Sequence, residues 1–317
     1  MGCFTLCRIR AARSVPKFND AANTMTSTET LTLDVITERA EREQIIAPNF
    51  KQVKLTKKFL LPKVKELETD MLRLRAEFDQ STNRMATKGS KTYPEGFCQE
   101  ITIGVMAILQ RELPSASTPG LMALRDFVAN GGLAKRIWGN LRNQYFQNAF
   151  QFGSLYVDVS NDTVVITKPK VEILPVSKAR MFPISDFDGY ADIAEKYWKG
   201  QVFPNRVLPD LAVMFPMFLI TTTGKVELHS NYQTILYRNL QFDFALAERF
   251  LFKSKRREDC LPESYLTKLV DRFGALENPV DDVTLRQHFE AARQSQLRFD
   301  ATRCQAMLDR VIALQNN

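Results

Sequence analysis

The stretch Ser154-Leu-Tyr-Val-Asp-Val-Ser160, followed by Asn161-Asp162 and then by Thr163-Val-Val-Ile-Thr167, carries the strongest strand pattern in the chain. β-branched and aromatic residues favour strands, and an Asn-Asp pair between two such runs is typical of a tight turn. We therefore predict a β-hairpin over residues 154–167. The stretch from Val171 to Val176 is expected to add a third strand.

A second hairpin is predicted from Met217–Thr222, a turn at Thr223-Gly224, and Lys225–His229. Helical patterns precede and follow the strands instead of alternating with them, which favours the α+β class over a doubly wound sheet. The expected fold is therefore α+β, with helices packed on a small central antiparallel sheet and a long C-terminal helix.

Apolar residues recur at helical spacing in several stretches. The pattern indicates an amphipathic helix between Pro62 and Gln80, and a second helix that begins at Cys98 after a Pro/Gly turn. Further helices are expected over residues 121–128, 133–150, 191–198, 242–252, 263–273 and 282–315.

The first 30 residues are small, polar and basic, and they predict a disordered leader. Residues 31–317 are expected to form a single globular domain, with a helical C-terminal subdomain at 238–317 as a variant of this organisation. Met25 is an alternative start of translation. The Met-Gly-Cys opening also suggests myristoylation of Gly2 and palmitoylation of Cys3, although Leu6 occupies the position where that motif has Ser or Thr.

The chain of 317 residues has a net charge of +7, and part of that charge lies in residues 1–17. This bias favours an anionic membrane surface as a partner through residues 1–17, whereas nucleic acid is not expected. Five cysteines at wide spacings, without a Cys-x-x-Cys pair, indicate free thiols and a reducing compartment. We expect a cytoplasmic protein that could associate with a membrane surface. We expect no cofactor and no metal, and the sequence leaves the oligomeric state open.

The candidate reactive residue is Cys98, which ends the hexapeptide Tyr93-Pro-Glu-Gly-Phe-Cys98 at the start of its helix. A thiol in the first turn of a helix lies near unpaired N–H groups and the positive end of the dipole, which favour the thiolate. A catalytic cysteine also requires a base. The chain has two histidines, and His229 is the better candidate because His288 is expected on the surface of a helix.

Together, the hexapeptide that ends at Cys98 and the strand Leu155–Val159 resemble the papain-like and transglutaminase-like cysteine superfamily. In that family a cysteine at the start of a buried helix packs on a small antiparallel sheet, which supplies the histidine and then Asp or Asn. The resemblance implies a cysteine hydrolase or acyl transferase that acts on a protein or a small amide or ester. It implies Cys98 as nucleophile, His229 as base, and Asp158, or the Asn239/Asp243 region, as the orienting group.

Three other interpretations of these residues stay open at this point. Cys98 could serve only as a small apolar residue in a core helix, and Asp158 could be a strand residue that faces water. The site is also compatible with a degenerate enzyme. The alternative function is a non-catalytic interaction protein, which could be peripheral at a membrane surface.

Overall fold

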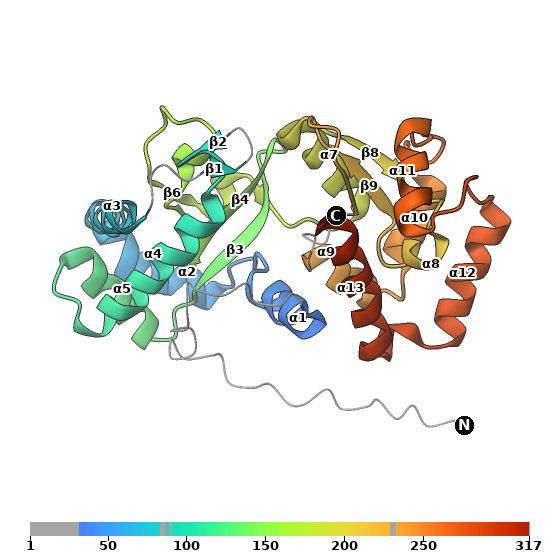
Figure 1. Ribbon diagram of the computed structural model, residues 1–317. Helices are drawn as coiled ribbons and strands as arrows, with labels where there is room; N and C mark the ends of the chain where they lie inside the picture. Colours follow the sequence, from blue (N-terminus) through green and yellow to red (C-terminus); the bar gives the residue numbers. More distant parts are fainter. Residues whose placement is uncertain (1–31, 83–86, 89–90, 229–232, 317) are drawn as a thin grey trace, which may run out of the picture.

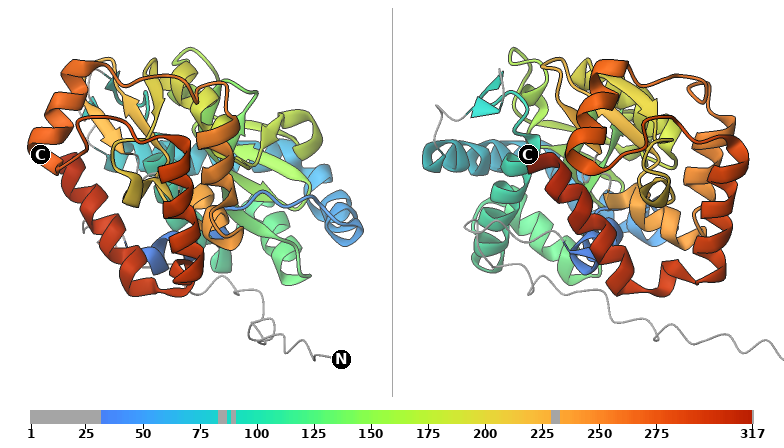
Figure 2. Two further views of the ribbon diagram at one scale, coloured as in Figure 1. Left: turned by 90° about the vertical axis from the view of Figure 1, so that its right-hand side faces the viewer. Right: turned by 45° about the vertical axis from the view of Figure 1, so that its right-hand side comes forward.

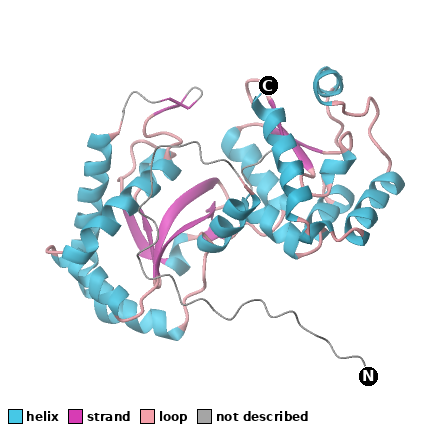
Figure 3. Cartoon of the chain, turned by 60° about the horizontal axis from the view of Figure 1, so that its bottom comes forward, coloured by secondary structure: helices cyan, strands magenta, loops and turns pink. Residues whose placement is uncertain are grey.

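The computed structural model describes residues 32–82, 87–88, 91–228 and 233–316. Figure 1 shows two bodies side by side. We call residues 50–182 the N-terminal lobe and residues 187–316 the C-terminal lobe. The main sheet lies in the N-terminal lobe, and a smaller sheet lies among the helices of the C-terminal lobe (Figure 3). This mixture of helices with separate antiparallel sheets confirms the α+β class.

The main sheet has five antiparallel strands in the order β6-β5-β4-β3-β7. Strands β3 to β5 follow one another along the chain, so each pairs with its sequence neighbour. The strands are β3 (Ala134–Leu141), β4 (Tyr145–Phe152), β5 (Leu155–Asp158), β6 (Glu172–Pro175) and β7 (Met181–Phe182).

Helices α3 (Val64–Ser81), α4 (Cys98–Glu112) and α5 (Pro119–Ala129) build one core with this sheet. The predicted stripe of α3 is confirmed, because Leu67, Met71, Leu74 and Phe78 are all buried. The short helix α2 (Phe50–Leu55) continues through a π turn (Thr56–Leu60) and a 3-10 turn (Leu61–Lys63) into α3. A small ribbon, β1 (Thr87–Lys88) and β2 (Lys91–Thr92), lies between α3 and α4 in the sequence.

The C-terminal lobe surrounds a three-stranded antiparallel sheet of order β10-β9-β8 (Figure 2). The sheet consists of β8 (Gln201–Pro204), β9 (Met217–Ile220) and β10 (Val226–Leu228), and the predicted β9–β10 hairpin is confirmed. The lobe's helices are α7 (Phe187–Trp198), α8 (Pro209–Ala212), α9 (Gln233–Gln241), α10 (Ala245–Lys253), α11 (Glu263–Phe273), α12 (Asp282–Gln294) and α13 (Ala301–Asn316), whereas α6 (Val176–Ala179) lies beside β6.

Helix α1 (Leu33–Arg42) packs on α9 and α13 although it precedes the whole N-terminal lobe in the sequence (Figure 1). The chain then returns to the main sheet, where the N–H of Trp138 on β3 bonds to the carbonyl of Glu43. The first helix therefore connects the two lobes.

The helix predicted over 133–150 is wrong, because this segment forms strands β3 and β4. Arg142 and Asn143 both have positive φ, at 58° and 56°, which is the conformation of a type I′ hairpin turn. The apolar spacing of Ile137 and Leu141 fits a helix as well as a strand. The apolar face of α4 decided between them, since strand alternation directs Phe150 and Phe152 into the α4 core.

The predicted hairpin at Asn161-Asp162 is also wrong. Strand β5 pairs with β6, whereas Asn161–Thr163 is a 3-10 turn followed by further turns. The loop closes differently because Asp162 bonds to the buried Arg75 and the Asn161 side chain bonds to the carbonyl of Pro169. The third strand predicted at 171–176 is confirmed as β6.

The single helix predicted over 282–315 is divided into α12 and α13. Gln296, with φ of 51°, and the 3-10 turn Leu297–Phe299 interrupt it, and the Asp300 side chain accepts a bond from the N–H of Arg303. The break lets two helices bury separate apolar faces: Leu285 and Phe289 on α12, Cys304 and Leu308 on α13. The C-terminal helix is confirmed, although it is shorter than predicted.

Candidate functional site around Cys98

The turn before Cys98 is held by backbone bonds. Gly96 has φ of 77°, a conformation that favours glycine, and its N–H bonds to the carbonyl of Thr163 at 2.9 Å. The N–H of Phe97 bonds to the carbonyl of Pro94, and the rings of Tyr93 and Phe97 make an edge contact. As predicted, Cys98 is the first residue of helix α4.

A buried ionic cluster fastens this turn to helix α3. The guanidinium of Arg75 is fully buried and contacts the carboxylates of Asp79 at 2.7 Å and Asp162 at 2.8 Å. Asp79 also accepts hydrogen bonds from Tyr93 and Lys170. Burial opposes ionisation of Asp79, but the bonds from Lys170, Tyr93 and Arg75 lower its pKa below the usual value. The cluster therefore joins α3, the 159–170 loop and the turn before Cys98.

Cys98 is 8% exposed, and its thiol contacts Asn148 of strand β4. The Asn148 side chain donates a hydrogen bond from Nδ2 to Sγ at 3.5 Å. Burial raises the pKa of the Cys98 thiol, and the charges of Asp158 and Glu100 add to this effect, although the bonds from Asn148 oppose it. The described surroundings of Cys98 therefore favour the neutral thiol over the thiolate.

Asp158 is fully buried, so the expectation that it could face water is wrong. Its carboxylate accepts bonds from Gln147 at 2.8 Å, from the Tyr156 hydroxyl at 2.8 Å, and from the N–H and hydroxyl of Ser160. Burial raises the pKa of Asp158 in spite of these bonds. Consecutive residues of a strand point to opposite faces, so Cys98 contacts the Asn148 face of β4 while Asp158 contacts Gln147.

The structure describes only some of the other predicted site residues. His229, Gly2 and Cys3 lie outside the described residues, so the Cys98–His229 pair and the lipidation of Gly2 and Cys3 stay predictions. Asn239, the alternative orienting residue, is buried and bonds to the carbonyl of Val213 and the N–H of Ala247. It therefore joins helices within the C-terminal lobe.

A cavity of about 380 Å³ opens beside Cys98, between the start of α4, strands β3 and β4, the end of α7 and helices α1 and α9. Its wall contains both tryptophans of the chain. The lining residues are aromatic (Trp138, Phe146, Tyr190, Tyr197, Trp198), charged (Arg39, Glu43, Lys91) or small and polar (Gly96, Cys98, Gln99, Asn148, Thr234).

Phe146 is the centre of the aromatic wall. Its ring stacks on Trp138 at 5.5 Å between centroids and at an interplanar angle of 12°. Trp198 and Tyr190 each lie 4.9 Å from the same ring, in tilted arrangements. Phe146, Asn148 and Phe150 alternate along β4, so one face of this strand runs from the α4 core, past the thiol, to the aromatic wall.

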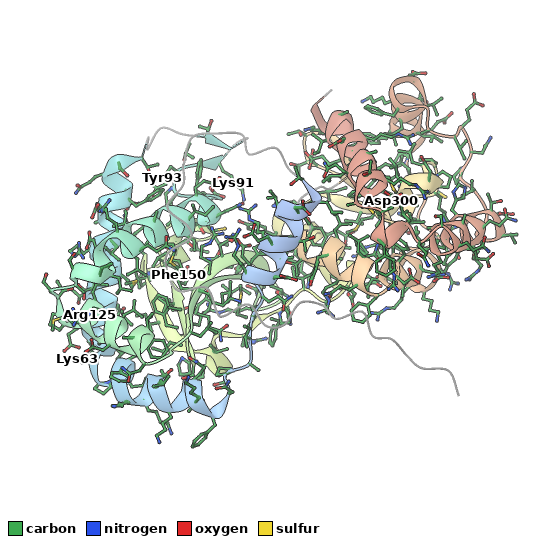
Figure 4. The ribbon with its side chains drawn as sticks, turned by 90° about the horizontal axis from the view of Figure 1, so that it is seen from below. Lys63, Lys91, Tyr93, Arg125, Phe150 and Asp300 are labelled. Carbon is green, nitrogen blue, oxygen red and sulfur yellow. The ribbon has the colours of Figure 1, made fainter. Side chains whose placement is uncertain are left out.

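The wall of the cavity includes two cationic side chains, Arg39 and Lys91. Lys91 Nζ lies 4.8 Å from the centre of the Tyr197 ring, a cation–π contact. Glu43 contacts both Arg39, at 3.4 Å, and Arg136, at 2.5 Å, so two guanidinium groups neutralise one carboxylate. Lys91 and Tyr93 are labelled in Figure 4, on the part of the N-terminal lobe above α1. Lys91 also pairs with Glu95 at 3.9 Å, so three cations, Arg39, Arg136 and Lys91, meet two carboxylates beside the cavity.

The Asp186-Phe-Asp188-Gly189 segment has a structural role. Asp186 caps α7 by accepting a bond from the N–H of Gly189 and pairs with Arg249, while Asp188 accepts a bond from Ser254. Among the described residues, no group of three or more His, Cys, Asp or Glu side chains could hold a metal ion.

Most residues of the cavity wall were not identified from the sequence. Trp138, Phe146 and Asn148 lie in the segment that the sequence wrongly predicts as a helix, and Tyr197 and Trp198 lie in a predicted helix that carries no functional prediction. Two signals could have identified them: both tryptophans lie within 61 positions that also contain Tyr145 and Tyr197, and Phe146, Phe150 and Phe152 fall on one face of a strand. Arg39 and Lys91 carry no such signal.

Comparison with protein-family models, with curated protein sequences and with solved structures found no match. The resemblance to the papain-like superfamily therefore stays a prediction. In the described part of the chain, every helix is too short or too polar to cross a bilayer.

Proposed function

We propose that this chain is a ligand-binding protein and that the cavity beside Cys98 takes a planar heteroaromatic molecule with a negative group. The observation that carries the proposal is the concentration of both tryptophans, Phe146 and two tyrosines around one cavity whose wall also contains Arg39 and Lys91. A volume of about 380 Å³ suits a ligand the size of a mononucleotide. The proposal is non-catalytic, like the alternative function considered above, but it assigns a small-molecule ligand in place of an interaction partner.

The chemistry of the lining supports each part of this ligand. Flat aromatic rings bind a heteroaromatic ring by offset stacking and by edge contacts. Asn148, Gln99 and Thr234 offer amide and hydroxyl groups to the edge of such a ring. Arg39 and Lys91 in the wall favour a carboxylate or phosphate on the ligand. The free thiols of Cys98, Cys260 and Cys304 support a reducing compartment such as the cytoplasm.

Intrinsic fluorescence tests the proposal directly, because both tryptophans of the chain line the cavity. The probes are adenosine 5′-monophosphate, adenosine without the phosphate, and ribose 5-phosphate without the ring. We expect the monophosphate to quench tryptophan emission with a Kd below about 1 mM, and each fragment to bind at least about tenfold more weakly.

Two variants assign the groups. Tyr197→Ala should weaken binding of the monophosphate and of adenosine together, whereas Lys91→Ala should weaken only the monophosphate. The exposed Lys268→Ala, remote in sequence from the cavity, is the matched control for Lys91→Ala and should leave both affinities unchanged. If none of the three probes changes the emission at millimolar concentration, the proposed ligand class is wrong.

A second candidate function is the cysteine hydrolase or acyl transferase. It is favoured by one observation: Cys98 starts a helix and lines the cavity, where a substrate carbonyl would meet the N–H groups of that helix start. In this reaction the Cys98 thiolate attacks an amide or ester carbonyl, and His229 transfers the proton to the leaving group. The raised pKa of Cys98 weighs against this function and favours a degenerate site.

Alkylation of Cys98 distinguishes the two functions. The pH dependence of haloacetamide labelling is measured at Cys98 by peptide mass spectrometry, with Cys260 as the exposed internal reference. The binding protein should label slowly at Cys98, with an apparent pKa above about 8.5 that His229→Ala does not change. An apparent pKa well below that value, restored by His229→Ala, would support the hydrolase.

A further inference from the structure

A lysine-rich helical segment forms the outer edge of the N-terminal lobe. Between Asn49 and Lys65 the chain has six lysines and no acidic residue. Helix α2 and the two turns after it cover residues 50–63 of this stretch without interruption. Lys63 is labelled in Figure 4, on the side of the N-terminal lobe that faces away from Asp300 and the C-terminal lobe.

One side of the segment anchors it to the lobe. The Gln52 side chain bonds to the carbonyl of Gly131 and accepts a bond from the N–H of Leu133. Thr56 is buried and accepts a bond from the N–H of Ser154, and Leu60 is buried in the α3–α4 core. These contacts recur at intervals of four residues, so the same side of the helix faces inward along its whole length.

The opposite side is exposed and combines apolar and cationic groups. The Phe50 side chain is 83% exposed and Leu61 is 44% exposed. Lys54, Lys57 and Lys58, also exposed, lie between them at helical spacing on the same side. An exposed Phe and Leu among lysines give this side of the segment the amphipathic composition of an interfacial helix.

We propose that this surface, defined by Phe50, Lys54, Lys57, Lys58 and Leu61, docks on an anionic lipid bilayer. Interfacial helices combine Phe or Leu, which enter the acyl boundary, with lysines that reach the headgroups. The cations of the segment are all lysine, a point charge suited to headgroup phosphates, whereas nucleic-acid surfaces favour the planar fork of arginine. The proposal is independent of the ligand in the cavity.

The test is sedimentation of the full chain with vesicles, at about 0.1 M salt. Vesicles of phosphatidylcholine alone are compared with vesicles that contain about 30% phosphatidylserine. We expect binding only to the anionic vesicles. The triple variant Lys54→Glu, Lys57→Glu, Lys58→Glu should lower the partition coefficient at least about tenfold, and Phe50→Ser should lower it several-fold.

The matched control is Lys178→Glu, Lys253→Glu, Lys268→Glu, which makes the same charge change at exposed lysines elsewhere and should retain binding within about twofold. Because residues 1–17 are also basic in sequence, each variant is repeated in a chain with Arg8, Arg10, Arg13 and Lys17 replaced by serine. Equal losses in the control and the triple variant would overturn the proposal. The proposal would also be overturned if the chain bound a single-stranded RNA oligomer but no vesicles, and if the triple variant lost this RNA binding.

Discussion

At the scale of single residues, Cys98 and Asp158 are both buried, as parts of the protein interior. Their surroundings differ from those that the sequence predicted. Burial raises the pKa of both groups, which favours the neutral thiol at Cys98, while four donated hydrogen bonds oppose the shift at Asp158. Hydrogen bonds from Asn148 to Cys98, and from Gln147 and Tyr156 to Asp158, hold them in position. A reactive thiolate needs the opposite environment.

Lys135 on β3 offers a prediction about pH. Burial lowers the pKa of its ammonium group to about 8, with Glu43 opposing the shift. Below pH 8, Lys135 is charged in the folded state, and burial of that charge lowers the free energy of unfolding. Between pH 8 and the ordinary value near 10.5 the folded state binds fewer protons than the unfolded state, so the free energy of unfolding rises with pH.

Lys135→Met should therefore raise the free energy of unfolding by about 1 kcal/mol at neutral pH, allowing for the partial exposure of Lys135. This gain should disappear as the pH rises towards 10.5. Urea denaturation at several pH values measures the difference. Lys135→Arg keeps the charge at every pH and should show neither the gain nor the pH dependence; a Met variant that behaves like Arg would contradict the prediction.

At the scale of elements, helix α3 is held to the 159–170 loop by Arg75 and to α4 by close packing. Arg75→Met leaves the carboxylates of Asp79 and Asp162 buried without their cation. The free energy of unfolding should fall by about 3–5 kcal/mol in denaturant titrations. Arg111→Met removes an exposed pair with Glu77 and should cost less than about 1 kcal/mol. Equal costs would mean that the buried cluster does not fasten the loop.

The packing of α4 on α3 depends on Gly104. A Cβ atom at this position would lie 2.0 Å from the Phe78 ring. Gly104→Ala should lower the free energy of unfolding by about 1–3 kcal/mol, although alanine favours a helix. Phe78→Leu makes room, so the double variant should lose less than the sum of the two single losses. Strict additivity in thermal denaturation would argue against this contact.

At the scale of the whole molecule, Phe146 joins the lobes, because it belongs to strand β4 of the N-terminal lobe but is buried in the core of the C-terminal lobe. Phe146→Ala should lower the free energy of unfolding by about 3–5 kcal/mol and shift tryptophan emission to the red, since Trp138 and Trp198 lose a shared neighbour. Emission spectra and denaturation measure both effects. The exposed Phe50→Ala is the control and should change neither.

The sequence by itself determined the elements whose signal is local. The stripe of α3, the helix that begins at Cys98, helix α11 and the β9–β10 hairpin all follow from apolar period and turn residues, and the α+β class follows from their order. Their residues carry enough local preference to select a structure before any distant contact forms.

Only the tertiary structure decided the rest. Residues 133–150 fit a helix or two strands, and packing against α4 selected the strands; Asn161-Asp162 fits a hairpin turn, and the buried Arg75 selected another loop. The cavity combines Arg39, Lys91, Cys98, Trp138 and Trp198 from separate elements. Such a wall has no signature in any one stretch, because contacts between residues far apart in the chain bring it together.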